Sequence, residues 1–253
     1  MMNKTALMIG LMGALTIPAA SAGMLAVEVG IMDWSDRTEA YFGEGKSENE
    51  YIAIKGATGN AFGDVFAIVK LEDFTDSDLM GSEINIVGQI NMGDSDFNWY
   101  GQVFNKQKPV WSETNTLLGF SHDKTWDNGW YTQVALAGHV VTSDYAHFKK
   151  ANGESFDANG FNGGYAYIGV SKDFSAYNQD FSFNWWQEHY FGRGDDYLIV
   201  SGDIEDHGFN GSANLRWHIS GGVSAAISYR YAQNNLGKEG WQNAMFYSMQ
   251  YNF

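Results

Sequence analysis

The final nine residues, MFYSMQYNF, place a large apolar or aromatic side chain at every second position. Phe253 and Tyr251 fall on one face of an extended chain, and Asn252 falls on the other. Successive side chains of a β-strand point to opposite faces, so this pattern predicts a strand with one apolar face. Residues 212–219 and 223–231 repeat the pattern, which extends the prediction to three consecutive strands.

The same period of two recurs along most of the chain. Two segments, 65–72 and 114–122, fit either assignment of their faces. Alternation by itself is also typical of a soluble β-sandwich, in which the apolar faces share one core. We predict twelve strands, at residues 32–42, 50–57, 62–72, 82–92, 96–105, 113–122, 129–141, 161–174, 180–191, 208–219, 223–232 and 242–253.

The lengths of the connections separate a barrel from a sandwich. Connections from even to odd strands are short, as at residues 59–60 and 221–222, whereas those from odd to even strands are mostly longer, notably 142–160 and 192–207. Outer-membrane barrels pair short periplasmic turns with longer external loops. The predicted fold class is therefore an all-β, antiparallel transmembrane barrel of twelve strands with both termini in the periplasm. Residues 195–206 are interpreted as the extension of one hairpin beyond the membrane.

The N-terminus has the pattern of a secretory signal peptide. Lys4 precedes an apolar run at residues 6–17, and small residues follow at Ala20 and Ala22. We predict cleavage after Ala22, which divides the chain into a signal peptide (1–22) and a barrel domain (23–253). The alternative is an N-terminal core helix. No later stretch reaches the roughly 18 apolar residues of a spanning helix, so insertion into a membrane requires a closed sheet.

Composition agrees with an exported barrel. The 253 residues carry a formal charge of −15, 16% aromatic residues, 30 Gly and no Cys. Exported chains without a large core usually depend on disulfides, but a closed barrel has no free strand edges to protect. The scarcity of Lys and Arg argues against nucleic-acid binding, which needs cations for the phosphates. We predict a location in the bacterial outer membrane, in contact with its lipid and lipopolysaccharide.

Four stretches carry a resemblance to a known family: NEYIAIKGATGNAFGDVFAIVKLEDF (49–74), FNGGYAYIGVSKDF (161–174), FNWWQEHYF (183–191) and the terminal strand. They resemble the Tsx-like nucleoside-channel family, which includes the OmpK outer-membrane proteins. The resemblance implies a twelve-stranded, monomeric barrel that passes nucleosides and also serves phages as a surface receptor. The chain departs from the family pattern at Lys55 and Lys70, and no nucleoside-contacting position of the family is carried over.

Charged and aromatic side chains gather on the face that we assign to the lumen. They suit a neutral, planar solute that stacks on a ring while its hydroxyls meet charged groups. The alternative is that these charges only pair with one another across the barrel, because a buried charge needs a partner or water. The predicted pore-lining or solute-binding residues are Lys55, Glu83, His139, Trp186, Glu188, Arg216, His218, Arg230 and Phe246.

Several short motifs receive a separate interpretation. Tyr251 and Phe253 are predicted to form the recognition signal for the outer-membrane assembly machinery and to lie in an aromatic girdle. Trp185 is assigned to the lipid face because it neighbours Trp186, and adjacent strand residues point to opposite faces. The tripeptide 193–195, Arg-Gly-Asp, is interpreted as a chance match to an adhesion motif.

No catalytic, metal or cofactor site is predicted. The six His show no pairing with a nucleophile, and no Cys or closely spaced His pair is present. The acidic loops are interpreted as a solvated, self-repelling rim, with divalent-cation binding as the alternative.

The sequence therefore favours a channel for passive diffusion of small solutes, with nucleosides as the expected class. Two alternatives stay open: a receptor or structural barrel with a closed lumen, whose loops bind phage or host, and a secreted β-sandwich lectin. Detergent dependence separates the lectin from both barrels, because a sandwich buries its apolar faces against each other.

Overall fold

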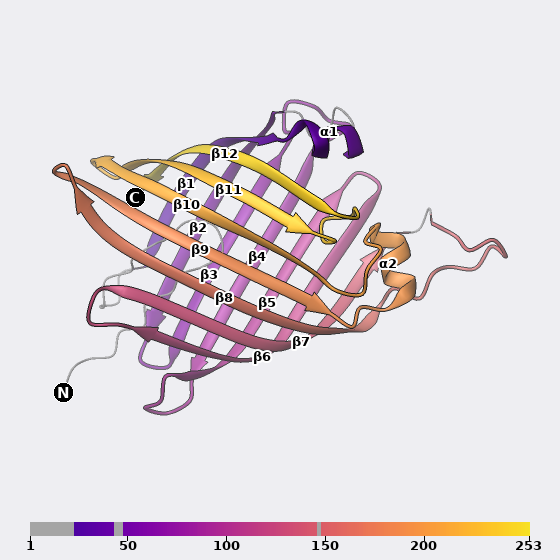
Figure 1. Ribbon diagram of the computed structural model, residues 1–253, viewed down its shortest axis with the longest axis horizontal. Helices are drawn as coiled ribbons and strands as arrows, with labels where there is room; N and C mark the ends of the chain where they lie inside the picture. Colours follow the sequence, from indigo (N-terminus) through magenta and orange to yellow (C-terminus); the bar gives the residue numbers. More distant parts are fainter. Residues whose placement is uncertain (1–22, 43–47, 146–147) are drawn as a thin grey trace.

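A computed structural model describes residues 23–42, 48–145 and 148–253, which form a closed antiparallel barrel of twelve strands (Figure 1). The predicted signal peptide, residues 1–22, lies outside the described residues. The strands are β1 (Met24–Trp34), β2 (Asn49–Asn60), β3 (Gly63–Glu72), β4 (Gly81–Asn91), β5 (Phe97–Lys108), β6 (Trp111–Thr125), β7 (Trp130–Asp144), β8 (Gly160–Ala176), β9 (Gln179–Phe191), β10 (Gly208–Ser220), β11 (Val223–Gln233) and β12 (Trp241–Asn252).

The barrel closes between its first and last strands. β1 pairs antiparallel with β12 from Ala26 opposite Asn252 to Trp34 opposite Ala244, and every other strand pairs with its neighbours in sequence. Closure leaves no strand edge for pairing with another chain. The β-sandwich lectin is therefore excluded, because a sandwich consists of two open sheets.

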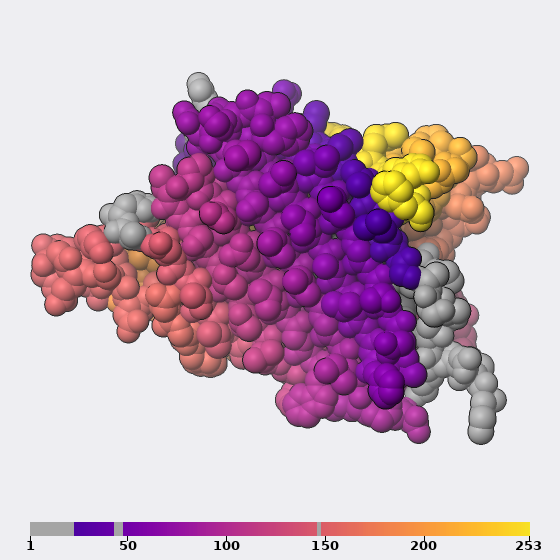
Figure 2. All heavy atoms as spheres, turned by 180° about the vertical axis from the view of Figure 1, so that it is seen from behind, coloured from indigo at the N-terminus to yellow at the C-terminus, as the bar shows by residue number. Residues whose placement is uncertain are grey.

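The faces of the strands are those of a membrane barrel, with apolar residues outside and polar residues inside. Leu118 and Leu136 are 66% and 65% exposed on the outer surface, whereas Lys55 and Arg216 are each 1% exposed in the interior. Figure 2 shows the outer side chains of the N-terminal strands as one continuous surface. Within the described residues, no helix is long and apolar enough to cross a membrane.

The predicted alternation of connection lengths is confirmed. The turns after β2, β8 and β10 have two residues each, and the connections after β7 and β9 run over residues 145–159 and 192–207. The exception is the connection after β5, which consists of Pro109 and Val110 alone. In the turn after β8, Tyr177 and Asn178 both have positive φ (54° and 57°), as a type I′ hairpin requires.

The predicted first strand, 32–42, is wrong: β1 begins at Met24, and residues Asp36–Phe42 form the short helix α1. The Ser35 carbonyl accepts the amides of Thr38 and Glu39, which starts the helix. Acidic residues in the first turn also favour the positive end of the helix dipole. The apolar alternation at residues 25–31 was missed because it directly follows the apolar signal segment.

Residues 195–206 do not extend a hairpin as predicted, because they contain the helix α2 (Asp195–Ser201). Two acidic residues open the helix, and Gly202 ends it with a left-handed φ of 81° that a glycine adopts without strain. Its Tyr197, Leu198 and Val200 are buried against the end of β7 and the following connection. Figure 1 shows α2 at the end of the barrel where the long connections gather.

Candidate functional site

All nine predicted lumen residues belong to the inward-facing positions of their strands. Four of them come together in one cavity: Trp186, Arg216, Arg230 and Phe246. Lys55 binds Glu28 at one end of this cavity, and the other four take part in polar contacts elsewhere in the barrel. The sequence thus predicted the face of each residue but not which residues meet.

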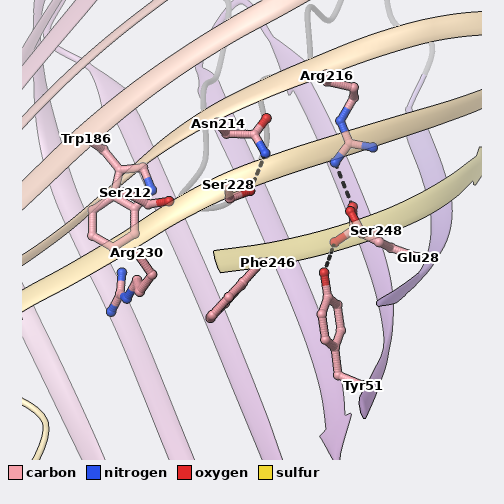
Figure 3. A pocket seen from close by; sticks show the side chains of 10 residues that line it. All are labelled: Glu28, Tyr51, Trp186, Ser212, Asn214, Arg216, Ser228, Arg230, Phe246 and Ser248. Carbon is pink, nitrogen blue, oxygen red and sulfur yellow. Dashed lines mark hydrogen bonds and ion pairs between the residues drawn. The ribbon is translucent and has the colours of Figure 1, made fainter. Parts of the chain in front are cut away.

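The cavity lies among β1, β2 and β9 to β12 and has a volume of about 20 Å³. This volume holds roughly one water molecule, so the side chains that line the cavity leave little free space between them. Figure 3 shows Trp186 and Arg230 at one end and Glu28 with Arg216 at the other, with Phe246 between them. The lining residues are Glu28, Tyr51, Trp186, Ser212, Asn214, Arg216, Ser228, Arg230, Phe246 and Ser248.

Glu28 is the charged centre of one end of the cavity. Its carboxylate lies 2.6 Å from Arg216 Nη2 and 2.8 Å from Lys55 Nζ, and it accepts a hydrogen bond of 3.0 Å from the Tyr51 hydroxyl. Arg216 also donates to the Ser224 hydroxyl at 3.0 Å. This cluster joins β1, β2 and β10, so structural pairing is confirmed for Lys55 and Arg216.

Sequence reasoning missed Glu28 and Tyr51 as lumen residues. The strand that holds Glu28 was placed eight residues too late, which removed it from the pattern. Glu28 lies between Val27 and Val29, and this alternation of apolar and polar residues indicated an inward-facing position on a strand. Tyr51 lay on a predicted strand, two residues from the apolar Ala53 on the same face, so its polar contact was not evident.

The other end of the cavity is built from Trp186 and Arg230. The Arg230 guanidinium lies 4.6 Å from the centroid of the Trp186 ring, a cation–π contact. In the described part of the chain, Arg230 forms no ion pair, and its Nη1 atom and Trp186 Nε1 are buried without hydrogen-bond partners. Phe246 packs edge-on to Trp34 at 6.1 Å and against Tyr51 at 6.4 Å between ring centroids.

Glu83 belongs to a second ion-pair cluster on β3, β4 and β5. Lys70 Nζ lies 2.8 Å from Glu72 and 3.1 Å from Glu83, and Lys106 lies 3.1 Å from Glu72. Lys108 continues the cluster to Asp73 at 2.8 Å. Ion pairs with lysines therefore explain why the Glu83 side chain is buried inside the barrel.

The remaining three predicted residues are held by hydrogen bonds. Glu188 accepts from Asn210 at 2.6 Å and from Tyr165 at 3.2 Å, while His218 contacts the Ser182 hydroxyl at 2.6 Å. His139 lies 2.6 Å from the Asn115 side-chain oxygen and 3.1 Å from the Asn162 carbonyl. These bonds satisfy the groups without a solute.

The helix α2 covers the mouth of the lumen at the end with the long connections. The hydroxyls of Tyr197 on α2 and Tyr145 after β7 both donate to the inward-facing Glu113, at 3.2 and 2.5 Å. The ring of Tyr197 also stands edge-on to His139, with 6.4 Å between ring centroids. The connection is therefore tied to the inner wall rather than free above it.

A buried ion pair holds the base of this connection. Arg193, 4% exposed, donates to Asp203 at 2.5 Å and to the carbonyls of Glu205 and Asn234. Burial raises the pKa of the Asp203 carboxyl to about 6, although the Arg193 guanidinium opposes that shift. Because Arg193 is buried, the Arg-Gly-Asp tripeptide does not form an exposed adhesive loop.

No group of three or more Asp, Glu or His side chains is arranged to hold a metal ion within residues 23–42, 48–145 and 148–253. Lys150 and Asp196 of the acidic loops form an exposed ion pair of 2.8 Å. The solvated rim stays a prediction, with divalent-cation binding by the loops as its alternative.

The fold, with its apolar outer face and polar interior, defines the class of the protein as an antiparallel β-barrel of the outer-membrane type. The NanC porin has a TM-score of 0.54 and 11% identity, over 90% of this chain and all of that chain. An outer-membrane channel from Pseudomonas putida F1 has a TM-score of 0.50 and 6% identity, over 94% of this chain and all of that chain. At these identities the likeness concerns the fold alone.

Residues 29–253 match the model of the family described as nucleoside-specific channel-forming protein, Tsx. The chain belongs to this family. The resemblance that the sequence suggested is confirmed, and it extends over nearly all of the described barrel.

Proposed function

We propose that this channel passes nucleosides by passive diffusion and that the cavity between Trp186 and Phe246 is where it selects them. One observation carries the proposal. In a barrel of this family, the cavity is lined by the rings of Trp186 and Phe246 together with buried polar atoms that have no hydrogen-bond partner within the described residues. A nucleobase stacks on a ring, and the sugar hydroxyls meet the polar atoms.

Passage requires side chains to move, because a cavity of about 20 Å³ is smaller than a nucleoside. Arg230 is suited to moving because its head group stacks on the Trp186 ring and, within the described residues, forms no ion pair of 4.0 Å or less, although the carboxylate of Glu188 lies within electrostatic range. A cation–π contact contributes about 0.5–2 kcal/mol, which thermal motion overcomes readily. Arg216, by contrast, is held by Glu28 and Ser224.

The test is single-channel conductance of the refolded protein in a planar bilayer, titrated with adenosine and thymidine and, as controls, glucose and leucine. Nucleosides are expected to reduce the current and the controls to leave it unchanged. Trp186→Ala is expected to weaken the nucleoside effect about tenfold, in line with about 1–3 kcal/mol per stacked base. Trp185→Ala is the matched control, since its ring lies on the outer face. An equal response to nucleosides and glucose, or equal losses in both variants, overturns the proposal.

The orientation and assembly of the barrel are part of the same proposal. Both termini lie in the periplasm, residues 1–22 are removed on export, and the barrel acts as a monomer without catalytic activity. Tyr251 and Phe253 present the assembly signal, and the outer surface contacts lipid and lipopolysaccharide. Support comes from the short turns at the end that holds the C-terminus and from the exposure of both aromatic residues there.

The small cavity favours a second candidate, a surface receptor whose external loops bind phage or host while the lumen stays closed. Absence of conductance from a correctly folded barrel supports this reading. Phage adsorption that is lost when the connection at residues 148–159 is shortened, with the barrel still in the membrane, distinguishes it from the channel.

A further inference from the structure

We propose that Asp64, Asp123 and the hydroxyl of Tyr131 form a binding site for a small hard cation inside the barrel. The site belongs to β3, β6 and β7, which do not line the cavity between Trp186 and Phe246. This inference goes beyond the proposed selection of nucleosides, because it rests on other residues and its main test needs no transport of a solute.

The three residues lie at the same end of the barrel because of their places in the strands. Asp64 is the second residue of β3, Tyr131 is the second residue of β7, and Asp123 lies two residues before the end of β6. All three are in phase with the buried, inward-facing positions of their strands. Figure 1 shows the turn between β6 and β7 at the end of the barrel opposite α2.

Hydrogen bonds show that the inner wall curves tightly at this end. Gln89 of β4, which lies opposite Asp64 in the sheet, donates to the Ser121 hydroxyl of β6 at 2.6 Å, across the intervening β5. Asn98 of β5 donates to the Asp123 carboxylate. This curvature brings Asp64 and Asp123 within electrostatic range of each other, although β4 and β5 separate their strands.

Two groups of the same charge therefore face each other at this site. The charged group that acts on Asp64 is Asp123, and like charges at short range are unfavourable. His122 and Asp96 act on Asp123 with opposite signs. His122 is cationic only when protonated, and its ring stands edge-on to the outward-facing Phe97, with 4.8 Å between ring centroids. Within the described residues, neither carboxylate has a Lys or Arg partner at 4.0 Å or less.

A buried hydroxyl at the same place points to a ligand. Tyr131 is 2% exposed, and its hydroxyl has no hydrogen-bond partner in the described part of the chain. This hydroxyl lies within electrostatic range of both Asp123 and Asp64. The Oδ1 atom of Asp64 is likewise buried without a partner among the described residues. Buried polar atoms are costly when they are left unsatisfied, so a bound species is expected between these groups.

The chemistry of the three groups selects a cation. Carboxylate oxygens accept but do not donate, and a phenol oxygen has lone pairs that can meet a metal ion. Water satisfies these atoms but leaves two negative charges facing each other. A hard cation takes oxygen ligands and supplies the counter-charge. Mg²⁺ is the matching divalent ion, because it is bound through one or two carboxylates and keeps several of its waters.

The first measurement is the thermal unfolding of the refolded barrel in detergent, in magnesium chloride and in choline chloride of equal ionic strength. Magnesium is expected to raise the unfolding temperature of the wild type by about 3–6 °C at ten times its half-saturating concentration. Asp64→Asn is expected to abolish this rise and, because the repulsion is relieved, to unfold no earlier than the wild type in choline. Asp127→Asn removes the same charge from the exposed turn after β6 and is the matched control, which keeps the rise.

Tyr131→Phe separates the hydroxyl from the ring. The variant keeps the packing of the ring and loses one oxygen of the site. The half-saturating magnesium concentration is expected to increase about fivefold, the worth of one hydrogen-bonding group.

The second measurement is the reversal potential of the channel in a potassium chloride gradient. The wild type is expected to prefer potassium over chloride, because the two carboxylates attract cations at one end of the lumen. Asp64→Asn is expected to lower the potassium-to-chloride ratio about threefold, as one elementary charge near the path of the ions predicts. Asp127→Asn is expected to leave the ratio unchanged.

Several results overturn the site. Equal responses to magnesium in the wild type and a folded Asp64→Asn barrel assign the effect to the acidic loops. Stabilisation of the wild type by acid, without a response to magnesium or potassium, shows that a shared proton neutralises the two carboxylates instead. Equal stabilisation by potassium chloride that is lost in Asp64→Asn supports the site, with a monovalent occupant.

The outcomes also separate this site from nucleoside selection. Failure of adenosine to block the current overturns nucleoside selection and leaves the response to magnesium unaffected. Absence of any conductance leaves the first measurement decisive for the cation site. Tyr131→Phe and Asp123→Asn decide the matter if Asp64→Asn does not fold.

Discussion

At the residue scale, the stability of the barrel interior depends on buried charges that form ion pairs with one another. Glu28 is the clearest case, because two cations and a phenol converge on its carboxylate. Removal of one member of a buried ion pair leaves the other charge uncompensated and costs about 3–5 kcal/mol. Replacement of the whole group by apolar side chains costs far less.

Glu28→Gln is therefore expected to destabilise the barrel by about 3–5 kcal/mol, because Lys55 and Arg216 lose their counter-charge. The free energy of unfolding in urea, measured in the same detergent as the wild type, checks this value. Adding Lys55→Met to Glu28→Gln is expected to restore part of the loss. A double variant less stable than the sum of the single variants contradicts the coupling.

Asp203 gives the connection after β9 a pH dependence. Its pKa in the folded protein is about 6, against 3.8 for an unperturbed carboxyl. The folded state thus binds the proton more tightly, so this contribution to stability is fully present below about pH 4 and is lost as pH rises through 6. The loss is on the order of 2–3 kcal/mol.

Hydrogen exchange of residues 192–207, compared between the wild type and Asp203→Asn at pH 5 and pH 8, tests this expectation. The variant keeps its neutral group at both pH values, and comparison at equal pH cancels the intrinsic exchange rate. The wild type is expected to lose protection relative to the variant between pH 5 and pH 8. If the difference in protection between the wild type and Asp203→Asn is the same at pH 5 and pH 8, the expected pH dependence is contradicted.

At the scale of elements, α2 is the segment whose role depends most on its contacts. Its apolar residues pack on the end of β7, and Tyr197 reaches the inward-facing Glu113. A seven-residue helix is too short to be stable alone, so these contacts hold it. The helix thereby narrows the mouth of the lumen.

Replacement of residues 195–201 by a Gly-Ser linker is expected to increase single-channel conductance, because the mouth loses its cover. Tyr197→Phe is the control: it keeps the ring, loses one hydrogen bond worth about 1 kcal/mol, and is expected to conduct like the wild type. Unchanged conductance of the linker variant means that the narrow part of the lumen lies elsewhere.

At the scale of the whole molecule, a change at the C-terminal residue Phe253 distinguishes an effect on the stability of the barrel from an effect on its assembly in the outer membrane. The Phe253 side chain is 76% exposed, whereas its backbone amide donates to the Leu25 carbonyl at 3.0 Å. Phe253→Ala keeps the backbone bond and is expected to refold in detergent with a stability within about 0.5 kcal/mol of the wild type. In cells, the amount in the outer membrane is expected to fall several-fold. Equal loss in both assays shows that Phe253 is structural rather than a signal.

Local patterns in the sequence determined the strands and their faces. Period-two alternation identified eleven of the twelve strands near their observed positions, and the predicted alternation of short and long connections is present with one exception. It also placed residues as far apart as Lys55 and Phe246 on the inner face. These features are local because the direction of a side chain depends only on its position along its own strand.

Tertiary structure alone decided which inward residues meet. Glu28 and Arg216 are 188 residues apart, and their contact depends on closure of β1 onto β12 and on the register of the intervening strands. The same closure brings Arg230 within electrostatic range of Glu188, whose carboxylate accepts hydrogen bonds from Asn210 and Tyr165. The helix α2 likewise depends on packing, since a short apolar run fits a strand or a helix equally well. Alternation determines the face of a residue, but only the closed barrel determines its neighbours.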